Sequence, residues 1–176
     1  MSALTGIRPY EDANRDAVIA LFRAFMAELA TPAVAPVIGL YMKAAIEQEL
    51  SRIPEYYLAR PGCGFWVIER DGVVGMVGVE RAEAGEAELR RMAVAHRHRN
   101  QGLGRALLRH AEAFCLDEGY AAIVLSTSEL QPAAMQLYAS SGYRLEHSAP
   151  ARESTHKSVG AGLVRHHFRK VLSPAR

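Results

Sequence analysis

The feature that most constrains the fold of this chain is a glycine-bearing segment, Arg99-Asn100-Gln101-Gly102-Leu103-Gly104. An apolar, strand-like run from Leu89 to Val94 precedes it, and the amphipathic pattern of a helix from Leu103 to Phe114 follows it. A turn that leads into a helix presents backbone N–H groups at the positive end of the helix dipole. Glycine has no Cβ, so an anion can approach this backbone closely. The segment therefore predicts a turn that binds phosphate or pyrophosphate.

Two familiar phosphate-binding motifs do not fit this turn. Its continuation from Gly102 to Leu107 reads G-x-G-x-x-L, whereas the dinucleotide fingerprint has a third glycine or an alanine at the last position. That fingerprint also requires a repeated βαβ unit, which the sequence pattern does not show. A Walker A loop needs Gly-Lys followed by Ser or Thr, which the segment lacks. Neither nucleotide-binding class explains the turn.

Hydrophobic periodicity and turn residues predict a mixed α/β order of elements. Asp71-Gly72 marks a hairpin turn, and Pro132 is placed near the first turn of a helix. A long polar loop is expected at residues 148–161. Helices are expected at 18–29, 37–51, 103–114 and 132–140. Strands are expected at 4–10, 65–69, 73–80, 86–94, 121–126, 143–147 and 163–171.

Composition narrows the class of protein. A chain of 176 residues is expected to form a single domain over residues 1–176. The net charge of +2 is too small to favour nucleic acid as a partner. Two cysteines, Cys63 and Cys115, make no disulfide framework, which predicts a reducing, cytoplasmic location. No signal peptide is recognised, and the most apolar window, residues 24–46, is interrupted by prolines and charges, so no membrane partner is expected.

Two blocks of the sequence resemble the signatures of the GNAT superfamily of acyltransferases. The first is Val94 followed by R-x-x-G-x-G from Arg99, which is similar to the coenzyme A pyrophosphate motif of that superfamily. The second is QPAAMQLYASSGY at residues 131–143, which resembles N-x-x-A-x-x-L-Y-x-x-x-G followed by Phe or Tyr. The similarity runs from Ile7 to about Leu172, and residues 65–67, 88–94 and 124–127 resemble the camello-like branch.

The resemblance implies an α/β (α+β) fold of the GNAT type, in which a central, mixed, mostly antiparallel sheet is flanked by helices. It implies transfer of an acetyl group from acetyl-CoA to a primary amine of a small molecule or a protein, by direct attack in a ternary complex. Homodimers are common in the superfamily, so a homodimer is a further expectation. The residues implied to bind acetyl-CoA are Met92, Ala93, Val94, Arg99, Asn100, Gln101, Gly102, Leu103, Gly104, Arg105, Gln131 and Tyr138.

Three groups are implied to act in catalysis. The N–H of Val94 is the candidate oxyanion-hole donor, which a bulge or splay in its strand would make accessible. Tyr138 is the candidate general acid, because a phenol is protonated at neutral pH and can donate to the leaving thiolate. Glu88 is the candidate base for the amine, or else it forms an ion pair with Arg90. Alternation along the strand places both of these on one face, together with Met92 and Val94.

Two positions depart from the superfamily pattern. Gln131 stands where asparagine is frequent, so its contact with the cofactor is open to test. Asn100 replaces a common glycine, and asparagine adopts left-handed backbone conformations more readily than most residues. The acceptor pocket is expected to involve Tyr41, the second helix and the loop after His147, because such connecting regions usually carry specificity.

The sequence also allows two other functions. A coenzyme A-binding regulatory module without turnover is the second hypothesis, and the intact Tyr138 argues against it. Residues 90–110 contain six Arg and three His and no acid, which allows a nucleic-acid surface, although interleaved aromatic residues are lacking. The histidines at 147, 156, 166 and 167 lack a compact ligand spacing, so no metal is expected.

Overall fold

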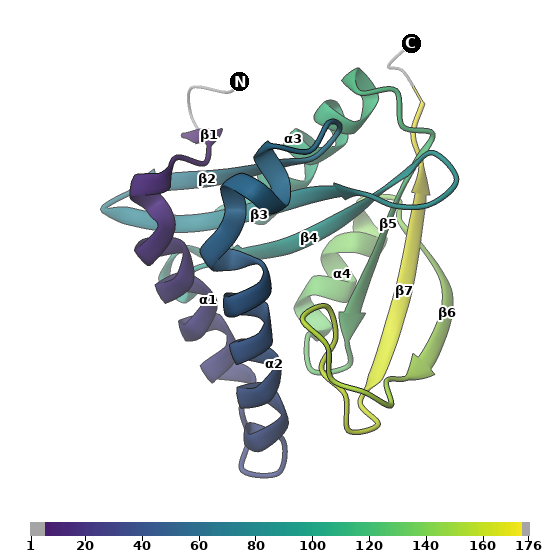
Figure 1. Ribbon diagram of the computed structural model, residues 1–176. Helices are drawn as coiled ribbons and strands as arrows, with labels where there is room; N and C mark the ends of the chain where they lie inside the picture. Colours follow the sequence, from purple (N-terminus) through teal and green to yellow (C-terminus); the bar gives the residue numbers. More distant parts are fainter. Residues whose placement is uncertain (1–5, 174–176) are drawn as a thin grey trace.

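The computed structural model describes residues 6–173, and its centre is a seven-stranded sheet with the order β1-β2-β3-β4-β5-β7-β6 (Figure 1). Every neighbouring pair is antiparallel except β4 and β5, so the sheet is mixed and mostly antiparallel, as predicted. The strands are β1 (Ile7–Pro9), β2 (Gly64–Arg70), β3 (Gly72–Arg81), β4 (Glu86–Val94), β5 (Ala122–Ser128), β6 (Arg144–Pro150) and β7 (Val164–Val171). The helices are α1 (Arg15–Leu29), α2 (Ala35–Gln48), α3 (Leu103–Asp117) and α4 (Pro132–Ser140).

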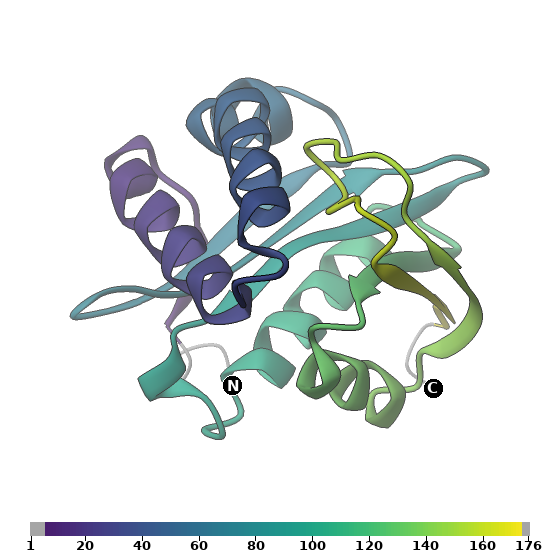
Figure 2. The same ribbon diagram turned by 90° about the horizontal axis from the view of Figure 1, so that it is seen from below.

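The helices cover the two faces of the sheet in pairs. Helices α1 and α2 lie on one face, whereas α3 and α4 lie on the other (Figure 2). The first pair buries apolar side chains such as Val18, Phe22 and Ile38 against β2, β3 and β4. On the opposite face, Leu107 of α3 and Tyr138 of α4 pack into a second cluster. Apolar burial on both faces holds the sheet between two helical layers.

Strand β4 separates from β5 partway along its length. The two strands pair from Glu86 to Glu88 of β4 with Ala122 to Val124 of β5, and β4 then continues to Val94 without that neighbour. Figure 1 shows the two strands diverging beyond this pairing. The C-terminal half of β4 therefore has one edge paired with β3 and the other edge facing a gap.

Strand β4 also contains a β-bulge. Its register with β3 shifts between the pairs Met76–Ala93 and Gly78–Arg90, so one extra residue stands on β4. Arg91 adopts a φ of +53°, a left-handed conformation that is uncommon for a residue with a side chain. An extra residue of this kind bends the strand and changes the direction of the side chains that follow it.

The bulge overturns the predicted alternation of side chains along β4. Arg90 and Arg91 both contact Glu49 on the α2 side of the sheet, although they are adjacent in sequence. Met92 and Val94 pack instead against the cluster on the α3 side, so they do not share a face with Arg90. Period-2 alternation is wrong from residue 91 onward because the bulge inserts one residue.

Several predicted elements differ in extent from the observed ones, and two of these differences have a clear local cause. The second helix was expected to reach Ser51, but α2 ends at Gln48 and gives way to a 3-10 turn, Leu50–Arg52, and a π-helical turn, Pro54–Leu58. The Ser51 hydroxyl donates to the Ile46 carbonyl (2.8 Å), and a proline at 54 has no N–H to continue an α-helix. Strand β6 extends beyond the predicted 147 because its pairing with β7 runs to Pro150. Part of the predicted first strand, residues 4 and 5, lies outside the described residues.

Candidate active site

The predicted phosphate-binding turn forms the start of α3. Gly102 precedes the helix with a φ of +79°, and Asn100 also has a positive φ, of +60°, as its tolerance for this region predicted. The helix ladder begins when the Ala106 N–H donates to the Gly102 carbonyl (3.0 Å). The N–H groups of residues 103–105 precede that bond, and such groups at a helix N-terminus can bind an anion.

A groove runs from this turn to α4, and we call it the outer groove. It contains all the residues that the sequence implied for acetyl-CoA, except Gln101. The side chain of Gln101 accepts a hydrogen bond from Arg70 (3.0 Å) and donates to the Arg97 carbonyl (3.3 Å). Gly104 packs closely against α4, because a Cβ at this position would lie 3.2 Å from the Leu137 side chain. Glycine thus allows α3 and α4 to form one continuous wall.

Arg99 lines the outer groove, but its guanidinium is occupied. It donates to Glu28 of α1 at 2.7 and 3.1 Å, and its Nε donates to the Val94 carbonyl (3.0 Å). The guanidinium also lies over the Phe25 ring. Arg105 is more open: it contacts the hydroxyls of Ser140 and Ser141 at 3.2 and 3.5 Å. Arg99 thus joins β4 to α1, and the backbone and Arg105 are the better placed anion donors.

A second cavity, which we call the inner pocket, lies between helices α1 and α2 and the diverging strands β4 and β5. The inner pocket and the outer groove share several lining residues, so they meet at the gap beside β4. Those shared residues are Phe25, Leu29, Met92, Ala93, Leu130, Gln131 and Tyr138. Tyr41 and two residues of the loop at 151–163 also line the inner pocket, where the sequence predicted an acceptor site.

Tyr138 lies at the junction of the two cavities. Its side chain is buried, and its ring packs 5.9 Å, between centroids, from both Tyr143 and Phe168. Burial raises the pKa of the Tyr138 hydroxyl above its ordinary value, so the phenol remains protonated at neutral pH. A protonated phenol at this junction can donate a proton to a group held between the two cavities.

The groups beside Tyr138 present further donors. Ala95 donates its N–H to the Val74 carbonyl of β3 (2.9 Å), so alternation directs the Val94 N–H to the other edge, toward the gap. The Gln131 side-chain carbonyl accepts from Thr127 (2.6 Å). Gln131 lines both cavities, and its amide nitrogen has no hydrogen-bond partner among residues 6–173.

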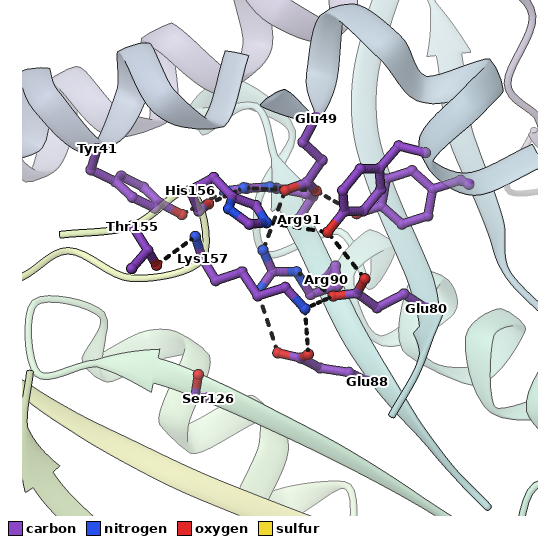
Figure 3. Close-up of polar contacts among 12 residues, drawn as sticks. Tyr41, Glu49, Glu80, Glu88, Arg90, Arg91, Ser126, Thr155, His156 and Lys157 are labelled. Carbon is purple, nitrogen blue, oxygen red and sulfur yellow. Dashed lines mark hydrogen bonds and ion pairs between the residues drawn. The ribbon is translucent and has the colours of Figure 1, made fainter. Parts of the chain in front are cut away.

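A buried ionic network forms the wall of the inner pocket on the α2 side (Figure 3). Its centre is the Glu49 carboxylate, which accepts hydrogen bonds from Arg91 (2.8 Å) and from the Tyr57 hydroxyl. Glu49 also forms an ion pair with Arg90 (3.3 Å). Burial opposes the charge of Glu49, but the hydrogen bond and charge of Arg91, with Arg90 and Tyr57, lower its pKa to about 2. The Glu49 carboxylate is therefore ionised at neutral pH.

The structure places Glu88 in this network as an ion-pair residue. Arg90 donates to Glu88 (3.2 Å), and the Lys157 ammonium lies 3.3 Å from it. Burial opposes its charge, but Arg90 and Lys157 outweigh that effect and lower the pKa of Glu88. The ion pair with Arg90 that the sequence allowed is therefore present, and the role of Glu88 as a base stays a prediction. A carboxylate held in this way is a weak proton acceptor.

The same network fixes the loop at 151–163 over the pocket. Arg91 donates to the backbone carbonyl of His156 and to the Tyr41 hydroxyl, and Lys157 pairs with Glu80. Figure 2 shows this loop on the α2 side of the sheet. The loop is therefore attached to β4 by the hydrogen bond from Arg91 and to β3 by the ion pair of Lys157 with Glu80.

Sequence reasoning missed the charged residues that join distant segments in this wall. Glu49 and Arg91 are 42 residues apart, and no local motif marks either one. Arg165 of β7, another lining residue, was recognised only as part of a strand. The described part of the chain contains no cluster of three or more His, Cys, Asp or Glu side chains placed to hold a metal. No helix within residues 6–173 has the length and apolar character needed to span a bilayer.

Comparisons with known proteins identify relatives and a common fold. The model of the Acetyltransferase (GNAT) family matches residues 32–143. Human N-acetylaspartate synthetase is 39% identical over 110 residues, covering 61% of this chain and 36% of that protein. Rat N-acetyltransferase 8 is 37% identical over 110 residues, covering 59% of this chain and 50% of that protein. The chain thus spans half or less of these curated relatives. A putative acetyltransferase from Salmonella typhimurium, yncA, solved with its cofactor acetyl-CoA, superimposes with a TM-score of 0.68 at 20% identity, covering 97% of this chain and 95% of that one.

Proposed function

Because this chain belongs to the GNAT family of acetyltransferases, we propose that it transfers an acetyl group from acetyl-CoA to a primary amine. The resemblance found in the sequence is confirmed at the level of the family, and N-acetyltransferase 8 is a camello-like relative. The names of both curated relatives describe N-acetylation. Acetyl-CoA is the proposed acetyl donor, as it is the cofactor of the solved neighbour.

The observation that carries the proposal is the meeting of two cavities at Tyr138 and the open edge of β4. A transferase that acts in a ternary complex needs separate sites for donor and acceptor that meet at the reacting atoms. The outer groove, with the N–H groups at the start of α3, suits the phosphate-rich donor. The inner pocket then receives the amine from the other side of the gap.

In the proposed reaction, the chain supplies two groups to the reacting atoms. The Val94 N–H donates to the thioester oxygen as the amine nitrogen attacks the carbonyl carbon, which stabilises the developing negative charge. Tyr138 gives its proton to the sulfur as the carbon–sulfur bond breaks, so that coenzyme A leaves as a thiol. The nitrogen proton passes to water, because the Glu88 carboxylate already accepts from Arg90 and Lys157.

The proposal is tested by free-thiol release from acetyl-CoA with a panel of amines, alongside calorimetric binding of coenzyme A. We expect binding of coenzyme A and release that depends on at least one amine. Binding without release for every amine would support a regulatory module instead. Failure to bind coenzyme A would contradict both the acetyltransferase and the regulatory module. A cytoplasmic location, a homodimer and the single domain remain predictions from the sequence.

A further inference from the structure

Arg165 differs from the other cationic residues that line the inner pocket. It lies on β7, and its Nη2 donates to the carbonyl oxygen (3.2 Å) and the hydroxyl (2.6 Å) of Ser126 on the neighbouring strand β5. Within residues 6–173 the guanidinium forms no ion pair with a carboxylate. Both of its observed hydrogen bonds use one nitrogen, so the other donors of its planar fork are available toward the pocket.

The other cationic residues that line the pocket form ion pairs with carboxylates that do not line it. Arg90, Arg91 and Lys157 line the pocket, and their partners Glu49, Glu80 and Glu88 stand outside the lining. No Asp or Glu among the described residues lines the pocket itself. The surface presented to an acceptor is therefore cationic, and Arg165 is its uncompensated charge.

We propose that Arg165 binds a carboxylate of the acceptor, so that the substrates are amines that also carry a carboxylate, as amino acids do. This inference rests on the proposed acetyl transfer. A guanidinium binds a carboxylate through two parallel N–H donors, which fixes orientation as well as charge. Ser126 holds Arg165 from β5, and the neighbouring Thr127 also lines the pocket.

The surroundings of Arg165 favour an anion in two ways. Burial disfavours its charged form and lowers its pKa, and the charges of Arg90 and Arg91 add to this effect, whereas Tyr41 and Glu88 oppose it. A bound carboxylate would compensate this loss of solvation. The same cationic wall disfavours a protonated amine beside it, which assists loss of the nitrogen proton and selects against polycationic acceptors.

Matched acceptor pairs test the inference. Free-thiol release is measured for glycine against glycinamide and for L-phenylalanine against L-phenylalaninamide, with spermidine as a polycation. The variants are Arg165→Gln, Arg165→Lys and, as a control, Arg144→Gln, which removes an exposed arginine of β6. We expect each carboxylate acceptor to exceed its amide in kcat/KM. Arg165→Gln should raise KM for the better carboxylates by about 10- to 100-fold, and the lysine variant should recover part of the loss.

The outcomes separate this inference from the proposed function. Turnover that favours amides or spermidine, or an Arg165→Gln variant with unchanged KM for carboxylates, would overturn the carboxylate site while leaving the acetyltransferase intact. If no amine is acetylated, the carboxylate site is tested by binding instead, with saturation-transfer NMR of L-aspartate in the presence of the protein and coenzyme A. A signal lost in Arg165→Gln and kept in Arg144→Gln supports the site, and a signal equal in all three proteins contradicts it.

Discussion

The outer groove and the inner pocket are built in different ways, although they meet at Tyr138. Most of the groove comes from two contiguous stretches, the turn at 99–105 and helix α4, with further lining residues from α1 and β4. At the turn it offers the backbone N–H groups of a helix N-terminus. The pocket is formed by side chains from α1, α2, β4, β5, β7 and a loop, joined by buried ion pairs. A site for a common cofactor can thus be encoded locally, whereas the acceptor site depends on long-range charge pairing.

The largest effect is expected from Glu49→Gln, which breaks the pocket wall. The change leaves Arg90 and Arg91 without their shared buried carboxylate, so we expect a loss of about 3–5 kcal/mol in the free energy of unfolding. Urea denaturation measures it. Glu47→Gln is the matched control, because its exposed pair with Lys43 at 4.0 Å should contribute less than about 0.5 kcal/mol. Equal losses in the two variants would show that the network is not what holds the wall.

Acid should remove the same stabilisation. The pKa of Glu49 is lowered from an ordinary 4.5 to about 2, so its contribution is fully present above 4.5 and is lost as the pH falls toward 2. The difference in unfolding free energy between wild type and Glu49→Gln should therefore shrink between about pH 5 and pH 3. Urea titrations over that range test this, and a difference that stays constant would contradict the assignment of the charge.

Gly102→Ala should damage the groove and spare the pocket. Gly102 has a φ of +79°, and a Cβ added there would meet no neighbouring atom. Alanine at this position therefore costs about 1 kcal/mol in backbone strain and places a methyl group at the turn. We expect coenzyme A to bind about tenfold more weakly. Gly119→Ala is the matched control, because its φ is +80°, its surroundings are also open, and it lies beyond the other end of α3. Calorimetry should find normal coenzyme A affinity in that control, and equal affinity losses would refute a role for the turn.

The smallest effect is expected from Glu88→Gln. As an ion-pair residue, Glu88 positions Arg90 and Lys157, so kcat should fall by less than about tenfold, with an unchanged pH profile. A general base would instead give a loss of roughly 100-fold or more and a shifted acidic limb. The pH dependence of kcat in the variant distinguishes the two roles.

The groove was predictable because its determinants are local. A strand, a turn with Gly102 and Gly104, and a helix follow one another, and the pattern around Tyr138 is contiguous. The irregularity that would make the Val94 N–H accessible is present in β4, both as a bulge and as separation from β5. The side-chain directions beyond it were predicted wrongly, because a single left-handed residue, Arg91, reverses the alternation and no sequence rule marks an arginine for that conformation.

The pocket could be predicted only in outline. Tyr41, the second helix and the loop after His147 were expected near the acceptor, and Tyr41 with Lys157 and Val159 of that loop line the pocket. Glu49 and Arg165 were not recognised, because a charged residue in a helix or on a strand usually faces solvent. Glu49 and Arg165 are buried among residues that are distant in sequence. These residues become neighbours only when the sheet brings β4, β5 and β7 together.

The proposed role of Tyr138 in the chemistry at the junction of the two cavities is tested by comparing Tyr138→Phe with Tyr143→Phe. Both residues are buried tyrosines of one cluster, but Tyr143 lines neither cavity, and its hydroxyl has no hydrogen-bond partner in the described chain. We expect Tyr138→Phe to lower kcat by roughly 10²- to 10⁴-fold with unchanged calorimetric affinity for coenzyme A, and Tyr143→Phe to retain wild-type kcat. Equal kcat values in the two variants would contradict it.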